Sequence, residues 1–249
     1  MMWKKVVICG IVVCGIVICL VLTLGQGCSY FVGEGREPTG EVTLKDNNYV
    51  VHYEWDYGGS RWVYDSEIPK ETYEYFSDRH RTSDYSEYVA NPSDDEWMRI
   101  LADLFSDEAK DEGWDEFQTV SFVLSFVQSM PYTSDELTAG YDEYPRYPVE
   151  TLVDKGGDCE DTSILFASIA RGMGYGVVLL KLEEDNHMAV GVKISRDTVN
   201  NWHHRYHLTY YTTTSDEIYA YCETTGEGWE LGHKPEDLKS TSAKLIELT

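Results

Sequence analysis

Lysine and arginine are scarce in this chain, and no stretch gathers them. The 249 residues contain 20 Lys and Arg against 44 Asp and Glu, a formal net charge of −24 at pH 7. Nucleic-acid binding needs clustered cations, because the release of phosphate counterions supplies much of the affinity. The composition therefore excludes a nucleic-acid partner, and the acidity favours solubility.

Cofactor and metal signatures are also missing. No phosphate-binding glycine loop, dinucleotide fingerprint, Cys-x-x-Cys pair or internal repeat occurs. The acidic stretch 133–144 lacks the spacing and the glycine of an EF-hand. His203, His204 and His207 could ligate a metal, but residues 203 and 207 share a face only on a helix, and this Tyr-rich segment favours a strand or loop. We predict neither a metal nor a cofactor.

The N-terminal region holds a long uncharged run. From Val6 to Leu24, 19 residues carry no charge, close to the ~20 that cross a hydrocarbon core as a helix. Lys4 and Lys5 precede the run, and the positive-inside tendency keeps that end in the cytoplasm. We therefore predict a single-pass membrane protein whose remaining residues lie outside the cytoplasm.

Two processing alternatives compete with a permanent anchor over residues 1–28. Gly25-Gln26-Gly27 has the small-x-small form of a signal peptidase site, and Leu24 to Cys28 loosely matches a lipoprotein processing box. The apolar run exceeds the roughly 15 residues of a normal signal peptide core, which favours the uncleaved anchor. Residues 29–47 are Gly-rich and polar, as in a tether.

The rest of the chain divides into a β-rich extension and a main domain. In residues 48–92, Asn48–Tyr64 alternates like a β-hairpin with a Gly58-Gly59 turn, and a Tyr-rich irregular stretch follows. For residues 93–249, periodicity and capping signals predict helices over 93–113, 117–130, 148–155 and from 158, and strands over 177–182, 187–195, 205–211 and 216–223. Helices followed by strands indicate an α+β fold.

Cys159 occupies the start of one of these helices. Asp158 can cap that helix and Asp161 completes a capping box, so the helix dipole favours a thiolate at residue 159. Against this, Asp158, Glu160 and Asp161 raise the pKa of the thiol unless a cation compensates. A histidine partner is therefore required.

Strand alternation supplies that partner and an acid. One face of strand 187–195 is apolar (Met188, Val190, Val192, Ile194), while His187 shares the other face with Ala189 and Gly191. In the last strand Tyr219, Tyr221 and Glu223 share one face, and Ile218, Ala220 and Cys222 share the other. Glu223 can then orient His187, while Cys222 packs inside.

Each residue also has an ordinary interpretation. Cys159 could form a disulfide with Cys222 outside the cell or simply be an inert small hydrophobe. His187 alone could be a strand residue bonded to a carbonyl, and Glu223 alone a solvated strand end. Only the ordered set, a helix-capping Cys, a strand His and a strand-end acid, favours nucleophilic catalysis.

Three motifs carry a family resemblance. Tyr147–Leu152 (YPVETL), Gly156–Asp161 (GGDCED) and His187–Val190 (HMAV) resemble the transglutaminase-like superfamily, near the bacterial and archaeal transglutaminase-like cysteine proteinases. The resemblance covers about half of the chain, roughly 117–232. It implies a papain-like arrangement, with the Cys on a central helix packed against an antiparallel sheet.

The resemblance also implies roles for the residues. Cys159 would be the nucleophile, His187 the general base and later acid, and Glu223 the orienting acid, although Glu223-Thr224-Thr225 stands where such enzymes often have Asp-Pro-Thr. For the oxyanion we expect the backbone N–H of Cys159, with the Gln128 side chain as a weaker candidate.

These residues predict a thiol enzyme that transfers acyl groups. A Cys159 thioester resolved by water gives a protease or amidase, and one resolved by an amine gives a cross-link. We expect hydrolysis of peptide or isopeptide bonds in a peptide, protein or cell-envelope polymer. The alternative is a non-catalytic module that keeps the fold and binds peptide or envelope polymer through Tyr219, Tyr221 and Trp229.

Overall fold

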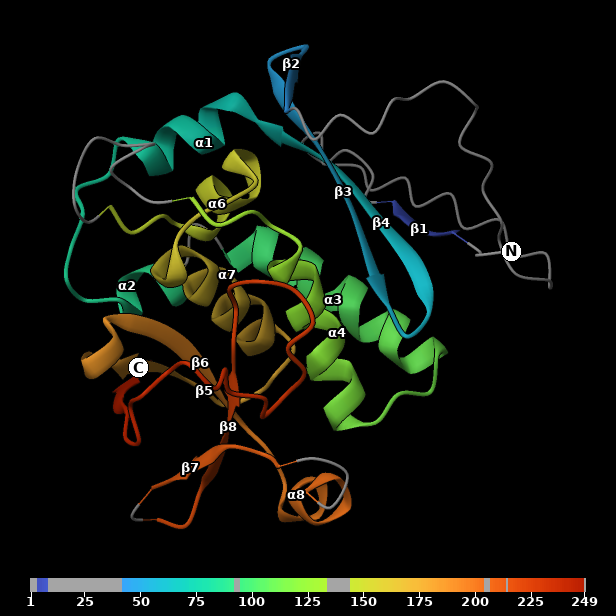
Figure 1. The fold of residues 1–249 in the computed structure, drawn as a ribbon. Coiled ribbons are helices and arrows are strands. Elements are labelled where there is room, and N and C mark those ends of the chain that lie inside the picture. Colours follow the sequence, from blue (N-terminus) through green and yellow to red (C-terminus); the bar gives the residue numbers. More distant parts are fainter. Residues whose placement is uncertain are drawn as a thin grey trace.

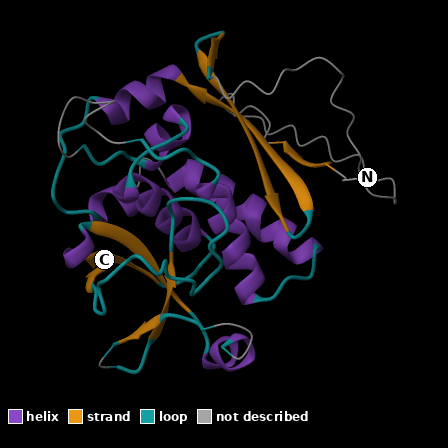
Figure 2. Ribbon diagram, in the orientation of Figure 1, coloured by secondary structure: helices purple, strands orange, loops and turns teal. Residues whose placement is uncertain are grey.

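Helices occupy the middle of the molecule and two β-sheets lie on either side of them (Figures 1 and 2). This computed structural model describes residues 4–8, 42–91, 95–133, 144–203, 207–213 and 215–248. The helices are α1 (Lys70–Ser77), α2 (Ser86–Val89), α3 (Asp95–Asp111), α4 (Glu116–Gln128), α6 (Pro148–Asp154), α7 (Cys159–Gly172) and α8 (Arg196–Trp202), with the 3-10 turn η1 (Glu183–Asp185).

The first sheet is built on the predicted hairpin. Strands β3 (Asn48–Tyr57) and β4 (Ser60–Pro69) are antiparallel, with Tyr57 opposite Ser60. Gly58 and Gly59 form the turn at φ of 60° and 79°, a left-handed conformation that glycine adopts without strain. The hairpin is confirmed and extends to Pro69. Strands β1 (Lys4–Ile8) and β2 (Thr43–Lys45) complete the order β1-β4-β3-β2.

The predicted membrane span falls mainly outside the described residues. Strand β1 pairs in parallel with β4 at the start of that segment, and residues 9–41, which hold the rest of the span and most of the tether, are not described. Among the helices that the structure describes, none is long and apolar enough to cross a bilayer. The anchor, the tether and the domain boundaries stay predictions.

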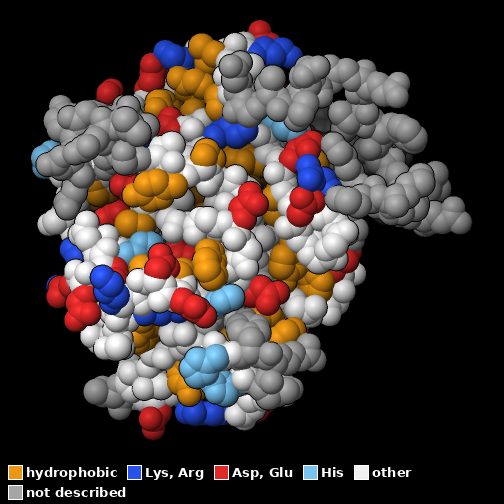
Figure 3. Space-filling model, viewed as in Figure 1, with side chains coloured by type: hydrophobic (Ala, Val, Ile, Leu, Met, Phe, Trp, Pro, Cys, Tyr) orange, Lys and Arg blue, Asp and Glu red, His pale blue; other side chains and the backbone are white. Residues whose placement is uncertain are grey.

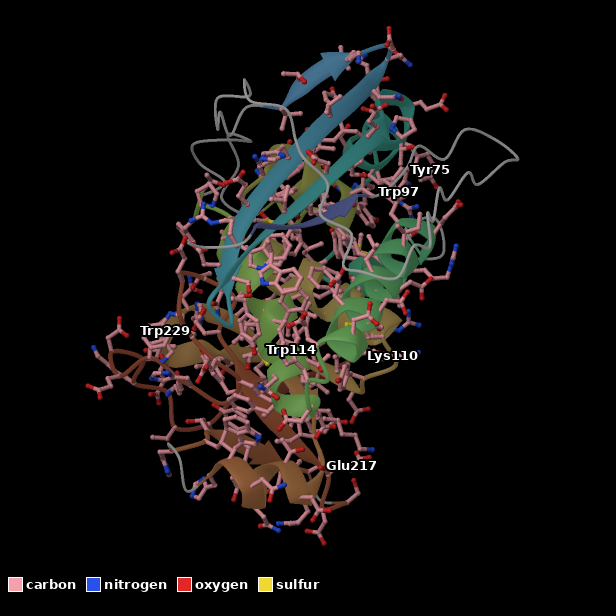
Figure 4. The ribbon with its side chains drawn as sticks, turned by 90° about the vertical axis from the view of Figure 1, so that its right-hand side faces the viewer. Tyr75, Trp97, Lys110, Trp114, Glu217 and Trp229 are labelled. Carbon is pink, nitrogen blue, oxygen red and sulfur yellow. The ribbon has the colours of Figure 1, made fainter. Side chains whose placement is uncertain are left out.

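Aromatic residues join the hairpin to the helices. Trp55 of β3 lies 5.1 Å from Phe126 and 5.9 Å from Phe122 of α4 between ring centroids. Trp114, before α4, packs against Phe122 at 4.7 Å and Tyr57 at 5.0 Å (Figure 4). One continuous core therefore contains residues of β3, β4, α3, α4 and α7.

The second sheet has the order β7-β8-β6-β5-β9 and is antiparallel throughout. Its strands are β5 (Val177–Leu182), β6 (His187–Lys193), β7 (Tyr210–Thr212), β8 (Ile218–Cys222) and β9 (Lys244–Glu247). Met188, Val190, Val192, Ile218, Ala220 and Cys222 belong to the main core, whereas Ala189, Tyr219 and Tyr221 belong to a second cluster. The predicted alternation is confirmed, and so is the α+β class with Cys159 on a central helix.

Three details of the strand prediction were wrong. Within the described residues 207–213, the strand expected over 205–211 is limited to Tyr210–Thr212, and β9 was not expected. Helix α8 was also missed. Its start is fixed by Ser195, whose side chain accepts the backbone N–H of Thr198 and ends strand pairing there.

Candidate active site

The N-terminus of α7 is capped as the sequence predicts. The Asp158 side chain accepts the backbone N–H groups of Glu160 at 3.1 Å and Asp161 at 3.3 Å, and Asp161 accepts the N–H of Asp158 at 3.3 Å. These reciprocal bonds satisfy donors that a helix start otherwise leaves open. Cys159 is thereby fixed as the first residue of the helix.

A buried ion pair holds the capping residue Asp161. The backbone N–H of Arg146 donates to Asp161 Oδ1 at 2.7 Å, and its guanidinium binds Oδ2 of the same carboxylate. Arg146 also donates to Asp154 at 3.1 Å. A Cβ on Gly157 would lie 2.4 Å from the Cβ of Asp161, so only glycine allows this approach. One of the three carboxylates next to Cys159 is thus neutralised.

The Cys159 thiol is a protonated donor in this structure. Sγ lies 2.9 Å from Glu160 Oε2, and the residue is buried. Burial raises the pKa of the thiol most, Glu160 and Asp158 raise it further, and the backbone N–H of Met188 lowers it without reversing the shift. The expectation that neighbouring carboxylates raise this pKa is confirmed, and burial adds to them.

His187 and Glu223 are joined directly. His187 Nε2 lies 3.0 Å and 3.2 Å from the two carboxylate oxygens of Glu223. Burial would raise the pKa of the Glu223 carboxyl, but bonds from His187, from Thr225 and from the Tyr221 hydroxyl at 2.6 Å outweigh it and lower that pKa. Glu223 is therefore a buried carboxylate that fixes Nε2, which leaves Nδ1 to exchange a proton.

Hydroxyl groups connect these strand ends to α7. Ser163 Oγ donates to the backbone carbonyl of Met188 at 3.3 Å. Thr224, next to Glu223, is 3.0 Å from the Thr162 hydroxyl and 3.1 Å from that of Ser163. Within the part of the chain that the structure describes, no hydrogen bond joins the Cys159 thiol to His187, since the thiol donates to Glu160 instead.

Gln128 does not act as the oxyanion donor for which its side chain was the weaker candidate. Its Nε2 donates to the backbone carbonyl of Glu223 at 2.7 Å and to that of Trp229 at 2.8 Å. An amide NH₂ has two hydrogens, and both are used. In this conformation Gln128 has no hydrogen left for an oxyanion and instead holds the chain after β8. The backbone N–H of Cys159 remains the candidate donor.

The expected contact surface of the binding alternative is largely internal. Tyr221 is 0% exposed and donates to Glu223, and Tyr219 is buried. Trp229 is half-buried, near the edge of the view in Figure 4, and packs edge-on against His233. Cys159 and Cys222 are both free and buried, so this structure does not contain the alternative disulfide.

The histidines considered as metal ligands lie beyond α8. The rings of His203 and His207 are 5.2 Å apart, and His204 lies outside the described residues, as does most of the acidic stretch 133–144. Among the described residues, no group of three or more His, Cys, Asp or Glu is placed to hold a metal ion.

Several residues of the site were missed by sequence reasoning. Arg146, Thr162, Ser163, Thr224 and Thr225 bind the presumed catalytic groups or their neighbours through contacts described above. Among these residues, Arg146 alone had a sequence feature that could have marked it, because it is a cation between an acidic stretch and Pro148. The hydroxyl residues look like ordinary helix and strand-end residues.

Comparisons with known proteins add no family. No family model and no curated protein matches the chain. Calcium-bound LapG of Legionella pneumophila is 18% identical, with 71% of this chain and 75% of that chain covered and a TM-score of 0.31. A proposed cysteine protease from Cytophaga hutchinsonii is 12% identical, with 83% and 73% covered and a TM-score of 0.36. TM-scores of this size establish neither a shared fold nor a shared activity.

Proposed function

We propose that the chain is a thiol enzyme of transglutaminase-like type that transfers acyl groups from amides. The observation that carries the proposal is the bonded His187–Glu223 pair on the strand whose Met188 carbonyl accepts the Ser163 hydroxyl of α7, the helix that Cys159 begins. A histidine held by a buried acid and a cysteine at a helix N-terminus are the groups that nucleophilic catalysis by a thiol uses.

In the proposed mechanism, the thiol proton moves from Cys159 Sγ to His187 Nδ1, and Glu223 stabilises the imidazolium that forms. The thiolate attacks the amide carbonyl, and the backbone N–H of Cys159 donates to the oxyanion. His187 then protonates the leaving amine as the C–N bond breaks, which leaves a thioester. Water or a second amine resolves this thioester and returns the proton to His187.

The substrate class is a peptide or isopeptide bond in a peptide, a protein or a cell-envelope polymer. The part of the uncharged run that follows β1, residues 9–24, would hold the domain at a membrane.

Trapping of the acyl-enzyme tests the proposal. The full chain would be incubated with peptide amides and quenched in acid, and the Cys159 peptide would be examined by mass spectrometry. We expect an acyl adduct on Cys159 that His187→Ala loses, with Cys159→Ser as the control for adduct position. Resolution in ¹⁸O-labelled water or with an added primary amine separates hydrolysis from cross-linking.

One observation favours the non-catalytic alternative, a module that binds peptide or envelope polymer. The thiol is protonated, buried and bonded to Glu160 rather than to His187. Peptide binding with no adduct, and with equal thiol reactivity in the wild type and His187→Ala, would favour the binding module.

A further inference from the structure

We propose that Glu160 selects the substrate, by favouring acyl donors with a positively charged side chain next to the reacting amide. This inference rests on the proposed acyl-transfer function. Glu160 lies in the first turn of α7, is half-buried, and places Oε2 2.9 Å from the sulfur that would attack. A group bound at the nucleophile therefore meets this carboxylate.

The carboxylate of Glu160 has fewer compensating partners than the carboxylates of Asp158 and Asp161. Asp158 accepts two backbone N–H groups, and Asp161 is bound by the buried guanidinium of Arg146. Within the described residues Glu160 makes no ion pair, and its carboxylate accepts the Cys159 thiol alone. His187 is bound to Glu223. The site thus supplies no cation of its own to Glu160.

Activation removes the partner that Glu160 has. When the thiol proton moves to His187 Nδ1, the electron pair stays on sulfur, and a thiolate stands beside the Glu160 carboxylate. Two negative charges at this distance repel strongly in a half-buried site. A lysine or arginine side chain of the substrate would bind Glu160 and stabilise the thiolate together, whereas an acidic side chain would add a third negative charge.

Long-range attraction is a separate effect. Asp and Glu side chains are spread over the face shown in Figure 3, and the whole chain carries a formal charge of −24. Such a field attracts any cation but weakens beyond about 10 Å in 0.1 M salt. The test must therefore compare Glu160 with another carboxylate near the site.

Charged methanethiosulfonates provide a test that needs no known substrate. The trimethylammonium-ethyl and sulfonatoethyl reagents transfer the same kind of alkylthio group to a thiolate, with methanesulfinate leaving, and differ in charge. Rates at Cys159 would be measured by mass spectrometry in the full chain at 0.15 M salt. Variants would be Glu160→Gln, Glu160→Lys and the control Glu184→Gln, an exposed carboxylate in the turn before His187.

We expect the wild type to react at least about tenfold faster with the cationic reagent. Glu160→Gln should lower the cation-to-anion ratio by about tenfold, Glu160→Lys should invert it, and Glu184→Gln should change it less than about twofold. Equal ratios in the wild type and Glu160→Gln, or equal effects of the two glutamine variants, would overturn the inference.

A second measurement connects the ratio to acyl transfer. Peptide amides with lysine, norleucine or glutamate beside the reacting bond would be compared by kcat/KM, and Glu160→Gln should reduce the lysine preference by the same factor. No acyl-enzyme with any peptide, together with a charge ratio that depends on Glu160, would reject the proposed function while keeping the charge selection. Acyl-enzyme formation without a lysine preference would reject the charge selection alone.

Discussion

Replacement of Glu223 by glutamine keeps the side-chain shape but turns one hydrogen-bond acceptor into a donor. Oε1 accepts the backbone N–H of Thr225 at 3.0 Å, and this N–H can only donate. Oε2 accepts the Tyr221 hydroxyl, which can also act as an acceptor. The amide will therefore point its oxygen at Thr225 and its NH₂ at Tyr221 and His187. The group nearest to His187 Nε2, now 3.0 Å away as a carboxylate oxygen, becomes a donor.

The expected consequence is a change of tautomer. Nε2 is driven to be an acceptor, so the proton of neutral His187 moves to Nδ1, the nitrogen that must take the thiol proton. Loss of a hydrogen bond between imidazolium and carboxylate removes about 1.5–3 kcal/mol, or roughly 10- to 100-fold in thiolate supply. In acyl transfer the wrong tautomer adds to this, and a loss of about 10³–10⁴ in turnover is expected.

The assay is the rate at which iodoacetamide alkylates the Cys159 peptide between pH 6 and 9, measured with the urea unfolding free energy of the same protein. Glu150→Gln is the matched control, because Glu150 is also buried but is bonded to Arg81 at 2.7 Å instead of to His187. It should lower stability and leave alkylation within about twofold of wild type. Wild-type alkylation and turnover in Glu223→Gln would refute the reasoning.

Three further changes test the scaffold. In Gly157→Ala the new Cβ would meet the Asp161 Cβ at 2.4 Å, so unfolding free energy should fall by about 1–3 kcal/mol and alkylation of the nucleophile should change; an unaltered urea midpoint would contradict this. Arg146→Met leaves buried Asp161 without its guanidinium and should cost about 3–5 kcal/mol in the same measurement, and a loss below about 1 kcal/mol would contradict it. Burial is the largest cause that raises the pKa of Tyr53, and the nearby Tyr64 and Asp154 raise it further. The folded state therefore holds the Tyr53 proton more tightly than the unfolded chain does. Stability should be complete below about pH 10 and fall above it, and Tyr53→Phe should lessen the total slope above pH 10 by about 1.4 kcal/mol per pH unit.

The elements that position the nucleophile could be predicted because their signals are local. Asp158 and Asp161 lie three residues apart in the capping-box pattern, and the structure has both bonds. Glu223 was found because residues two apart share a strand face, which placed it with Tyr221 on the side of His187. The capping inference needed no knowledge of packing, whereas the pairing of Glu223 with His187 also drew on the family resemblance, which implies that the two strands are neighbours.

Contacts between distant segments could not be predicted in this way. Gln128 lies 95 residues before the Glu223 carbonyl that it binds, and no pattern near Gln128 says which carbonyl its amide will meet. Helix α8 was missed for a related reason, since the Ser195 cap follows directly on an apolar strand whose alternation gave no sign of ending. Local rules describe elements, whereas the partners of a buried polar group depend on how those elements pack.

The same packing explains why the pKa of the Cys159 thiol is raised. Burial is the largest cause that raises the pKa of Cys159, and a substrate that excludes more water would raise it further. The backbone of Met188 lowers the pKa of the thiol, but it is already present and does not reverse the shift. What remains able to change on binding is charge, and Glu160 is the carboxylate bonded to the sulfur itself. Reactivity at Cys159 should therefore depend on the charge of what approaches it, and a neutral alkylating reagent should react faster when a small non-denaturing cation such as methylammonium is added to the wild type but not to Glu160→Gln.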